Sequence, residues 1–367
     1  MRRTPALIVG GGPAGAAAAI ALAGRGGSPL LLERSTGAHD VVCGGFMGWD
    51  ALAALERLGI DVEALGAQRI DNLLLVAGER SALLALPRAA AGLSRQKLDA
   101  ALLACAEDRG ARVERGVTVR SIDAATRTAL LADGREIAAD ALFLATGKYE
   151  LRGAQRSASP GDDPPVGLRM RLEATPRLSR ALQNRVELFL FDRGYAGMLL
   201  QEDGTVNFCL TAARSRLAAA GGSAERLVVE LAAECPTLAD RLGDMVGAGS
   251  WSSIARVPYG WRAETTTDGI FRLGDQVAVI ASVVGDGIAI ALESARMASE
   301  HYFERGAAAA AGYQRSFARH VDWPVRIAGW LRATVETPRG ARVLMPVVDL
   351  LPALARSVIR ATRVGGY

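Results

Sequence analysis

The first 35 residues alternate between short apolar runs and a stretch rich in alanine and glycine. Residues 6–9 are apolar and lead into glycine, residues 13–24 have the composition of a buried helix, and residues 29–33 form a second apolar run. This order predicts a strand, a helix and a second strand, which together make a βαβ unit.

Helices and short strands are also predicted between residues 50 and 150. Residues 50–65 and 95–109 are expected to be helical, and Gly110 ends the second of these helices. Alternating apolar positions predict strands at residues 112–123, 129–131, 136–137 and 141–144, with a turn at 132–134.

The pattern changes after about residue 151. A loop rich in proline, aspartate and glycine over residues 157–165 is followed by alternating segments at 186–191 and 205–211. These segments predict an antiparallel sheet with one open face. Residues 223–234 are predicted to form a helix with Ser223 as its N-cap.

Near residue 270 the chain returns to the pattern of its beginning. A short apolar strand at 271–274 precedes a long predicted helix at 287–303. The last 60 or so residues are expected to be helical or irregular, because four prolines interrupt them.

Composition excludes several classes of function. The net charge of +4 comes from scattered arginines, since Lys97 and Lys148 are the only lysines, so no basic stripe predicts nucleic-acid binding. Three dispersed histidines and four separated cysteines predict no metal site, and the absence of a CxxC pair fits a reduced, cytoplasmic protein. Glycines interrupt the apolar N-terminus, which argues against a secretion signal, and no apolar run reaches the roughly 18 residues that span a bilayer.

Gly10-Gly11-Gly12-Pro13-Ala14-Gly15 fits the GxGxxG pattern between the first predicted strand and helix. Gly10 permits the tight turn, Gly12 lets the backbone approach a pyrophosphate, and Gly15 lets the helix pack on the strand. Glu33, 21 positions after Gly12, can bind ribose hydroxyls and would repel a 2′-phosphate. The unit therefore predicts a dinucleotide site formed by Gly10, Gly12, Pro13, Ala14, Gly15, Glu33 and Arg34.

A second set of motifs resembles the FAD fingerprint of the para-hydroxybenzoate hydroxylase and geranylgeranyl reductase superfamily. It consists of Phe271-Arg272-Leu273-Gly274-Asp275 followed by Gly285-Asp286-Gly287-Ile288. The resemblance implies that Gly274 and Asp275 reach the flavin ribityl chain, and that Gly285, Gly287 and Ile288 face the isoalloxazine and pyrophosphate.

Three weaker similarities to the same superfamily extend this site. Ser94-Arg95-Gln96-Lys97-Leu98-Asp99 is similar to its Arg-x-x-Leu-Asp pattern, which implies that Arg95 reaches the FAD phosphates. Thr146 and Gly147 are similar to a strand-end signature near the cofactor, and Val119 stands where relatives contact the adenine.

Cys43-Gly44-Gly45 resembles the Cys-Gly-Gly segment that geranylgeranyl reductases carry near the flavin. The resemblance implies that Gly44 and Gly45 approach the flavin. Cys43 has two interpretations, a thiol that assists proton delivery and a small packing residue. The family's Tyr-x-Trp-x-Phe-Pro signature keeps only Tyr195, and the Trp-x-Trp-x-Ile-Pro motif of flavin halogenases has no counterpart.

We therefore predict an α/β fold with a discontinuous, Rossmann-like FAD-binding domain, an antiparallel β-sheet substrate domain and a helical C-terminus. The predicted boundaries are 1–75, 95–150 and 266–305 for the FAD-binding domain, 76–94 and 151–265 for the substrate domain, and 306–367 for the helical segment.

The motifs predict an FAD-dependent oxidoreductase, in which NAD(P)H is at most a transient electron donor because no second GxGxxG exists. We favour a reductase that gives hydride to an alkene of an apolar, prenyl or polyketide-like molecule in secondary metabolism. Two alternatives stay open, a monooxygenase acting on an aromatic or polyketide substrate and a flavin-binding protein without catalysis. The sequence leaves the substrate, the electron donor and the oligomeric state open.

Four aromatic residues are candidates for an apolar substrate cavity, with buried packing as the alternative for each: Trp49, Tyr195, Tyr259 and Trp261. Lys148 is interpreted as a solvated lysine. Residues 344–364 are apolar with interspersed arginines, and we expect them to cap the cavity or pack in a subunit contact rather than to touch a membrane surface.

Overall fold

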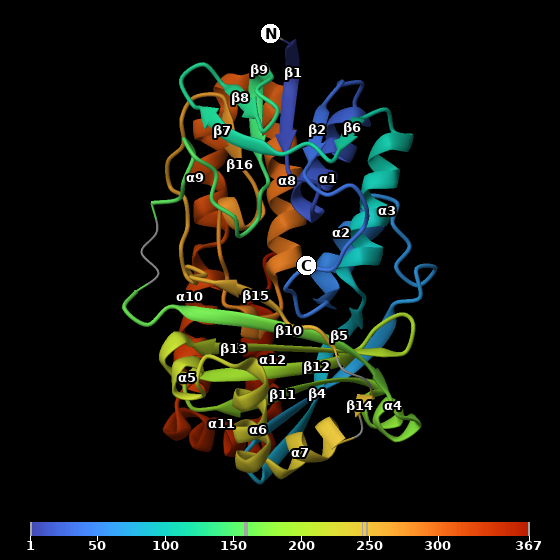
Figure 1. The fold of residues 1–367 in the computed structure, drawn as a ribbon, viewed down its shortest axis with the longest axis vertical. Coiled ribbons are helices and arrows are strands. Elements are labelled where there is room, and N and C mark those ends of the chain that lie inside the picture. The colour runs from blue at the N-terminus through green and yellow to red at the C-terminus, as the bar shows by residue number, and fades with distance from the viewer. Residues whose placement is uncertain (1, 158–160, 244, 247–248, 366–367) are drawn as a thin grey trace.

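The structure is a computed structural model that describes residues 2–157, 161–243, 245–246 and 249–365. It has two sheets, one above the other in Figure 1, with a helical C-terminal segment beside the lower one. The predicted loop at 157–165 lies partly outside the described residues. No helix in the described part of the chain combines the length and the apolar character that crossing a bilayer requires.

The upper sheet has the parallel core of a dinucleotide-binding fold. Its strand order is β6-β2-β1-β9-β8-β7, and β16 pairs in parallel with β9. The strands are β1 (Arg2–Val9), β2 (Leu30–Glu33), β6 (Arg112–Arg115), β7 (Val119–Asp123), β8 (Thr128–Leu131), β9 (Glu136–Leu144) and β16 (Ile270–Arg272). The pairing of β16 with β9 makes this unit discontinuous in sequence, as predicted.

Three helices pack together on this sheet: α1 (Pro13–Ala23), α3 (Arg95–Asp108) and α8 (Gly287–Arg305). α1 lies at the centre, and ten of its eleven residues are buried. Its alanines let α8 and α3 approach closely, because small side chains shorten the distance between helix axes.

The lower sheet is mostly antiparallel, with the order β14-β10-β13-β12-β11-β4-β5-β3 and with β15 paired to β10. Its strands are β3 (Phe46–Met47), β4 (Gln68–Ala77), β5 (Arg80–Gly92), β10 (Pro165–Ala174), β11 (Asn184–Phe191), β12 (Gly194–Leu200), β13 (Thr205–Ala213), β14 (Met245–Val246) and β15 (Ser252–Ala255). β4 belongs wholly to this sheet, so the first domain boundary falls before Gln68 and not at residue 75.

Helices cover both faces of the lower sheet, so the expectation of one open face is wrong. α4 (Pro176–Leu182), α6 (Ala224–Glu234) and α7 (Pro236–Gly243) bury leucines on one face, and α5 (Arg214–Ala219) adjoins them. On the other face lie α10 (Asp322–Val335), α11 (Pro338–Leu350) and α12 (Pro352–Ala361). α9 (Ala310–His320) links α8 to α10.

Local geometry accounts for the remaining differences from the predicted elements. The predicted helix at 50–65 is α2 (Trp49–Arg57), which ends before Gly59, a residue with a left-handed backbone. The predicted strand at 112–123 is divided into β6 and β7, because Gly116 between them is also left-handed. Pro338 and Pro352 begin α11 and α12, where a missing N–H is tolerated, so these two prolines start helices instead of interrupting them.

Candidate functional site

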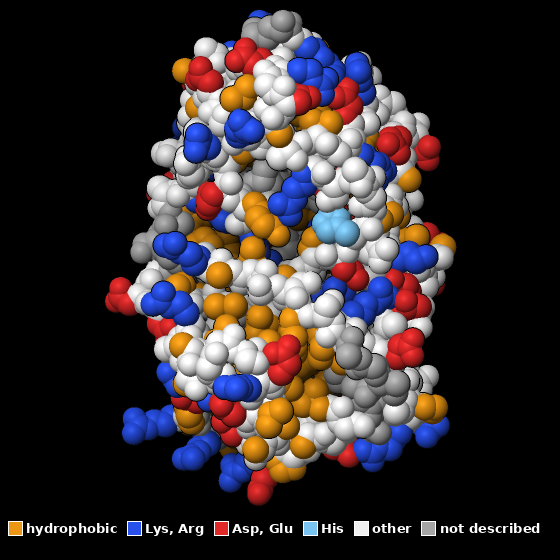
Figure 2. All heavy atoms as spheres, in the orientation of Figure 1, with side chains coloured by type: hydrophobic (Ala, Val, Ile, Leu, Met, Phe, Trp, Pro, Cys, Tyr) orange, Lys and Arg blue, Asp and Glu red, His pale blue; other side chains and the backbone are white. Residues whose placement is uncertain are grey.

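A cavity of about 670 Å³ lies between the two sheets and extends beneath α10, α11 and α12. Figure 2 shows the surface hollowed at this level, with hydrophobic and basic side chains around the opening. Most of the cavity wall is aliphatic, contributed by the lower sheet and the C-terminal helices. An apolar molecule therefore fits this space better than a highly charged one.

The glycine-rich turn at the upper end of the cavity is tied to Glu33. The backbone N–H of Gly11 donates to Oε2 of Glu33 at 2.6 Å, and the N–H of Ser35 donates to Oε1 at 2.8 Å. Gly10 has φ +108°, and a side chain there would collide with the carbonyl of Ala145. Only glycine satisfies both conditions at this turn.

Arg95 brings a partly buried positive charge to the N-terminus of α1. Its Nη2 lies 3.2 Å from the position that a Cβ of Gly12 would occupy, and its guanidinium donates two hydrogen bonds to Asp99, at 2.8 and 2.7 Å. Burial works against the charge, but the carboxylate of Asp99 raises the pKa of Arg95 above its ordinary value. A cation beside a helix N-terminus is a suitable environment for phosphate groups.

Three glycines on the cavity wall leave room for a flat group. A Cβ on Gly44, Gly147 or Gly287 would meet no atom within 4 Å, and all three residues line the cavity. Because these three glycines have no side chains, they leave an open space, which we call the cradle. The cradle begins near the N-terminus of α1, where phosphate groups could bind. The residues present fit FAD, whose pyrophosphate would lie at Gly12 and Arg95 and whose flavin would lie in the cradle.

The structure brings most of the sequence-predicted residues to this one cavity. Those on its lining are Gly12, Pro13, Ala14, Cys43, Gly44, Gly45, Arg95, Gly147, Gly274, Asp275, Gly285, Gly287 and Ile288. Gly10 and Gly15 lie behind this wall, where a side chain on either would collide with backbone. Thr146 also lies behind it, with its hydroxyl donating to the carbonyl of Tyr149 at 2.9 Å.

Arg34 and Val119, which were predicted on the adenosine side, are not part of this cavity lining. The guanidinium of Arg34 rests 4.1 Å from the ring centre of Tyr149. Val119 sits in β7 opposite Leu131. The backbone N–H of Val117 donates to the backbone carbonyl of Glu33 at 2.9 Å.

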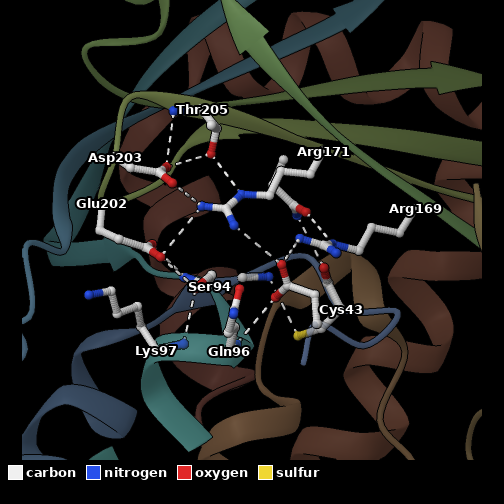
Figure 3. A network of polar contacts seen from close by, with 12 residues as sticks. Cys43, Ser94, Gln96, Lys97, Arg169, Arg171, Glu202, Asp203 and Thr205 are labelled. Carbon is white, nitrogen blue, oxygen red and sulfur yellow. Dashed lines mark hydrogen bonds and ion pairs between the residues drawn. The ribbon is translucent and has the colours of Figure 1, made fainter. Parts of the chain in front are cut away.

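A network of polar contacts holds the loop that carries Cys43 (Figure 3). The side-chain amide of Asn207 on β13 donates to the carbonyls of Cys43, at 3.1 Å, and of Gly44, at 2.7 Å. Arg169 donates to the amide oxygen of Asn207 at 2.6 Å and pairs with Asp40 at 3.0 Å. The lower sheet thus fixes the backbone of the Cys-Gly-Gly segment at the cavity wall.

The same network fixes the start of α3. Glu202, after β12, accepts hydrogen bonds from the N–H and hydroxyl of Ser94 at 2.9 and 2.5 Å, and the Ser94 hydroxyl caps the N–H of Lys97 at 3.1 Å. Arg171 bridges Glu202 and Asp203, as Figure 3 shows. Because Arg95 follows Ser94 directly, the lower sheet also helps to position the guanidinium near Gly12.

Three hydroxyl groups form a cluster on the cavity wall. The hydroxyl of Ser282 lies 2.5 Å from that of Tyr195 and 2.7 Å from that of Tyr259. Burial raises the pKa of Tyr195 well above its ordinary value, so this residue keeps its proton at neutral pH. The cluster provides uncharged hydrogen-bonding groups on the wall of a mostly aliphatic cavity.

The other two aromatic candidates do not line the cavity. Trp49 begins α2 and lies 4.8 Å beneath the guanidinium of Arg363, whereas Trp261 lies 5.8 Å from that of Arg156. Trp49 is buried and Trp261 is half-buried. Lys148, expected to be solvated, lines the cavity with its Nζ 3.9 Å from the carboxylate of Asp275. Burial opposes its charge, but Asp275 raises the pKa of Lys148, so a cation stands at the cradle.

Residues 362–365 form a C-terminal clasp on the turn before α8. Arg363 pairs with the buried carboxylate of Asp286 and donates to the carbonyl of Val284 at 3.0 Å. The backbone N–H groups of Val364 and Gly365 donate to Asp50 at 3.2 and 3.4 Å. The clasp therefore supports the turn that carries Gly285 and Gly287, and no motif in the sequence had indicated it.

Comparisons with known proteins agree with this geometry. Residues 3–150 match a family model described as an FAD binding domain. A menaquinone reductase of Mycolicibacterium smegmatis is 26% identical over 320 residues, which cover 81% of this chain and 76% of the relative. Among solved structures, the flavin-dependent brominase Bmp2 superposes with a TM-score of 0.81 at 16% identity, covering 99% of this chain and 94% of its own.

Another solved structure, P. aeruginosa PqsL in complex with 2-aminobenzoylacetate, superposes with a TM-score of 0.74 at 16% identity, covering 94% of this chain and all of its own. The fold is thus that of flavin-dependent enzymes. The chain is an FAD-dependent oxidoreductase, and its match over residues 3–150 together with its fold fits the superfamily of the para-hydroxybenzoate hydroxylase type.

Proposed function

We propose that this enzyme reduces a carbon–carbon double bond of an apolar small molecule of prenyl or polyketide-like type. The observation that carries the proposal is the continuity of the cavity, which runs from the glycine cradle past the hydroxyl cluster to the aliphatic wall under α10–α12. A substrate in this space has one end beside the flavin position and its apolar part against leucine and valine side chains.

The chain's own groups have separate tasks in this proposal. Arg95 and the turn at Gly12 would hold the phosphates of FAD, and Asp275 would bind the ribityl hydroxyls with Lys148 beside it. Bound FAD supplies the hydride, which it receives from NAD(P)H or another donor. Tyr195 and Cys43, both on the cavity wall, are the candidates for giving the proton that completes the reduction.

One relative that matches over most of both chains is named a menaquinone reductase. Menaquinone has a long apolar side chain, so this similarity supports a substrate of the same kind. The hydroxyl cluster supports a second candidate function. Tyr195, Ser282 and Tyr259 can hydrogen-bond a phenolic oxygen, which would suit a monooxygenase that hydroxylates an aromatic ring.

The two functions differ in their use of oxygen. The purified holoenzyme would be given NAD(P)H and a polyprenyl quinone without air, and separately a long-chain phenol in air, with products identified by mass spectrometry. The anaerobic sample would be reoxidised in air before analysis, which returns any quinol to the quinone, and we expect a gain of two hydrogen atoms that persists in the side chain. Gain of an oxygen atom in air, with no anaerobic product, would establish the monooxygenase instead. A short-chain quinone is the matched control for the apolar part.

A further inference from the structure

The cavity opens to the surface between three helices that contact one another. Trp330 on α10, Val343 on α11 and Leu354 on α12 each line the cavity, yet they are 66%, 67% and 51% exposed. Apolar side chains at this degree of exposure surround the opening instead of closing it. We call this surface the mouth face.

The mouth face continues beyond the opening. Trp323 on α10, Leu350 at the end of α11 and Leu351 before α12 are also exposed. Six large exposed apolar residues therefore lie within residues 322–354, more than in any other segment of similar length in the described parts of the chain. Soluble surfaces rarely gather apolar side chains in this way unless the surface meets a partner.

The charges of α11 and α12 indicate which partner. The two helices carry Arg339, Arg342, Arg356 and Arg360, and for none of the four does the described structure contain an ion pair with a carboxylate, while Asp349 is the only acidic residue in either helix. Figure 2 shows basic side chains projecting from the lower edge of the molecule, on the side where Figure 1 draws α11. Apolar helices with unpaired arginines are the pattern of helices that lie on an anionic bilayer.

We propose that the mouth face docks on an anionic lipid surface, so that apolar molecules enter the cavity directly from the bilayer. A second copy of the chain is a poorer occupant. A twofold contact would set this surface against itself and would bring the four arginines near those of the other copy. The docking is peripheral, because no described helix can cross the bilayer. The helices that line the cavity therefore also present the docking surface, whereas the sequence had favoured a cap or a subunit contact over a membrane surface.

The test is binding of the holoenzyme to vesicles, which needs no substrate and so stands apart from the proposed reaction. Sedimentation would compare vesicles of phosphatidylcholine alone with vesicles that also contain phosphatidylglycerol, at low and high salt. We expect binding to the anionic vesicles that weakens with salt, together with a blue shift of tryptophan fluorescence from Trp323 and Trp330.

Two double variants separate the apolar contribution to vesicle binding from the electrostatic one. Leu350→Ser with Leu351→Ser, and Arg339→Gln with Arg342→Gln, should each weaken binding by about tenfold, without changing thermal unfolding or flavin content. The matched control is Val229→Ser, because Val229 on α6 is 69% exposed but lies away from the mouth face. Absence of vesicle binding, equal binding to neutral vesicles, or a dimer that the leucine variants dissociate would overturn the proposal.

Discussion

The hydroxyl oxygens of Tyr195 and Ser282 lie 2.5 Å apart, although the two residues are 87 positions apart in the sequence. Tyr259 approaches the same serine oxygen at 2.7 Å. Tyr195 also hydrogen-bonds the hydroxyl of Thr211, so four hydroxyl hydrogens serve three contacts and one remains for an oxygen of a bound molecule. The cluster thus gives an otherwise aliphatic cavity one defined polar point.

Because Tyr195 is buried, we expect the protein to lose stability at alkaline pH. Burial, with a smaller contribution from Tyr259, raises the pKa of Tyr195 in the folded protein, whereas in the unfolded chain the side chain ionises near pH 10. The free energy of unfolding should therefore fall as the pH rises above about 10, and Tyr195→Phe should make that fall shallower. Denaturant unfolding between pH 8 and 11 measures the slope. Equal slopes in the two proteins would contradict the assignment, and Tyr149→Phe, at an exposed tyrosine, is the control.

The ion pair between Arg95 and Asp99 has a structural and a cofactor role that a double variant separates. Arg95→Met leaves Asp99 without its cation and should cost about 2–3 kcal/mol of stability. Arg95→Met with Asp99→Leu should recover most of that stability but none of the lost FAD affinity, because the cation near Gly12 is still missing. Thermal unfolding and FAD titration of the apoprotein measure the two effects. Recovery of FAD affinity in the double variant would show that Arg95 acts only through the fold.

Gly287 tests the cradle with the least disturbance of the fold. Its missing side chain faces open space, so Gly287→Val should leave apoprotein unfolding nearly unchanged and should abolish FAD binding by filling the flavin position. Gly329→Val is the matched control, since Gly329 is also helical with open space but does not line the cavity. Flavin absorbance of the purified proteins gives the answer. If the purified Gly287→Val protein were still yellow, the flavin could not lie against the turn before α8.

From the contacts of the clasp, we expect Arg363 to support both the stability of the protein and cofactor binding. Arg363→Met leaves the fully buried Asp286 without a cation and should destabilise the protein by about 3–5 kcal/mol. Adding Asp286→Asn removes the uncompensated charge and should restore about half of the loss. FAD affinity should fall in the single variant, because the turn at Gly285 loses its support. Arg360→Met on exposed α12 is the control, and a loss as large there would refute a specific role of the clasp.

The parts of the site that local sequence determines were predictable. The glycine-rich turn and Glu33 meet because β1 and β2 are adjacent strands, so spacing along the chain was enough to place them. The upper sheet was recognisable for the same reason. β4 and β5 were not, because helices bury part of both faces of the lower sheet and the apolar–polar alternation that marks a half-exposed strand is weakened.

Contacts between distant segments could not be predicted. Whether Trp49 faces a cavity or a guanidinium depends on Arg363, more than 300 positions later, and the amide of Asn207 holds the Gly44 carbonyl across 163 positions. Lys148 was interpreted as solvated for the same reason, since only the folded chain places Asp275 beside it. Polar partners of this kind leave no periodic pattern in the sequence.

The separation of these partners also orders events during synthesis. The glycine-rich turn emerges first from the ribosome, β16 and the turn before α8 emerge more than 250 residues later, and Arg363 follows them. A nascent chain therefore lacks a finished FAD site until nearly all of these 367 residues have been made. We therefore expect the cofactor to bind late in synthesis, and a chain that stalls before the clasp emerges to bind flavin weakly.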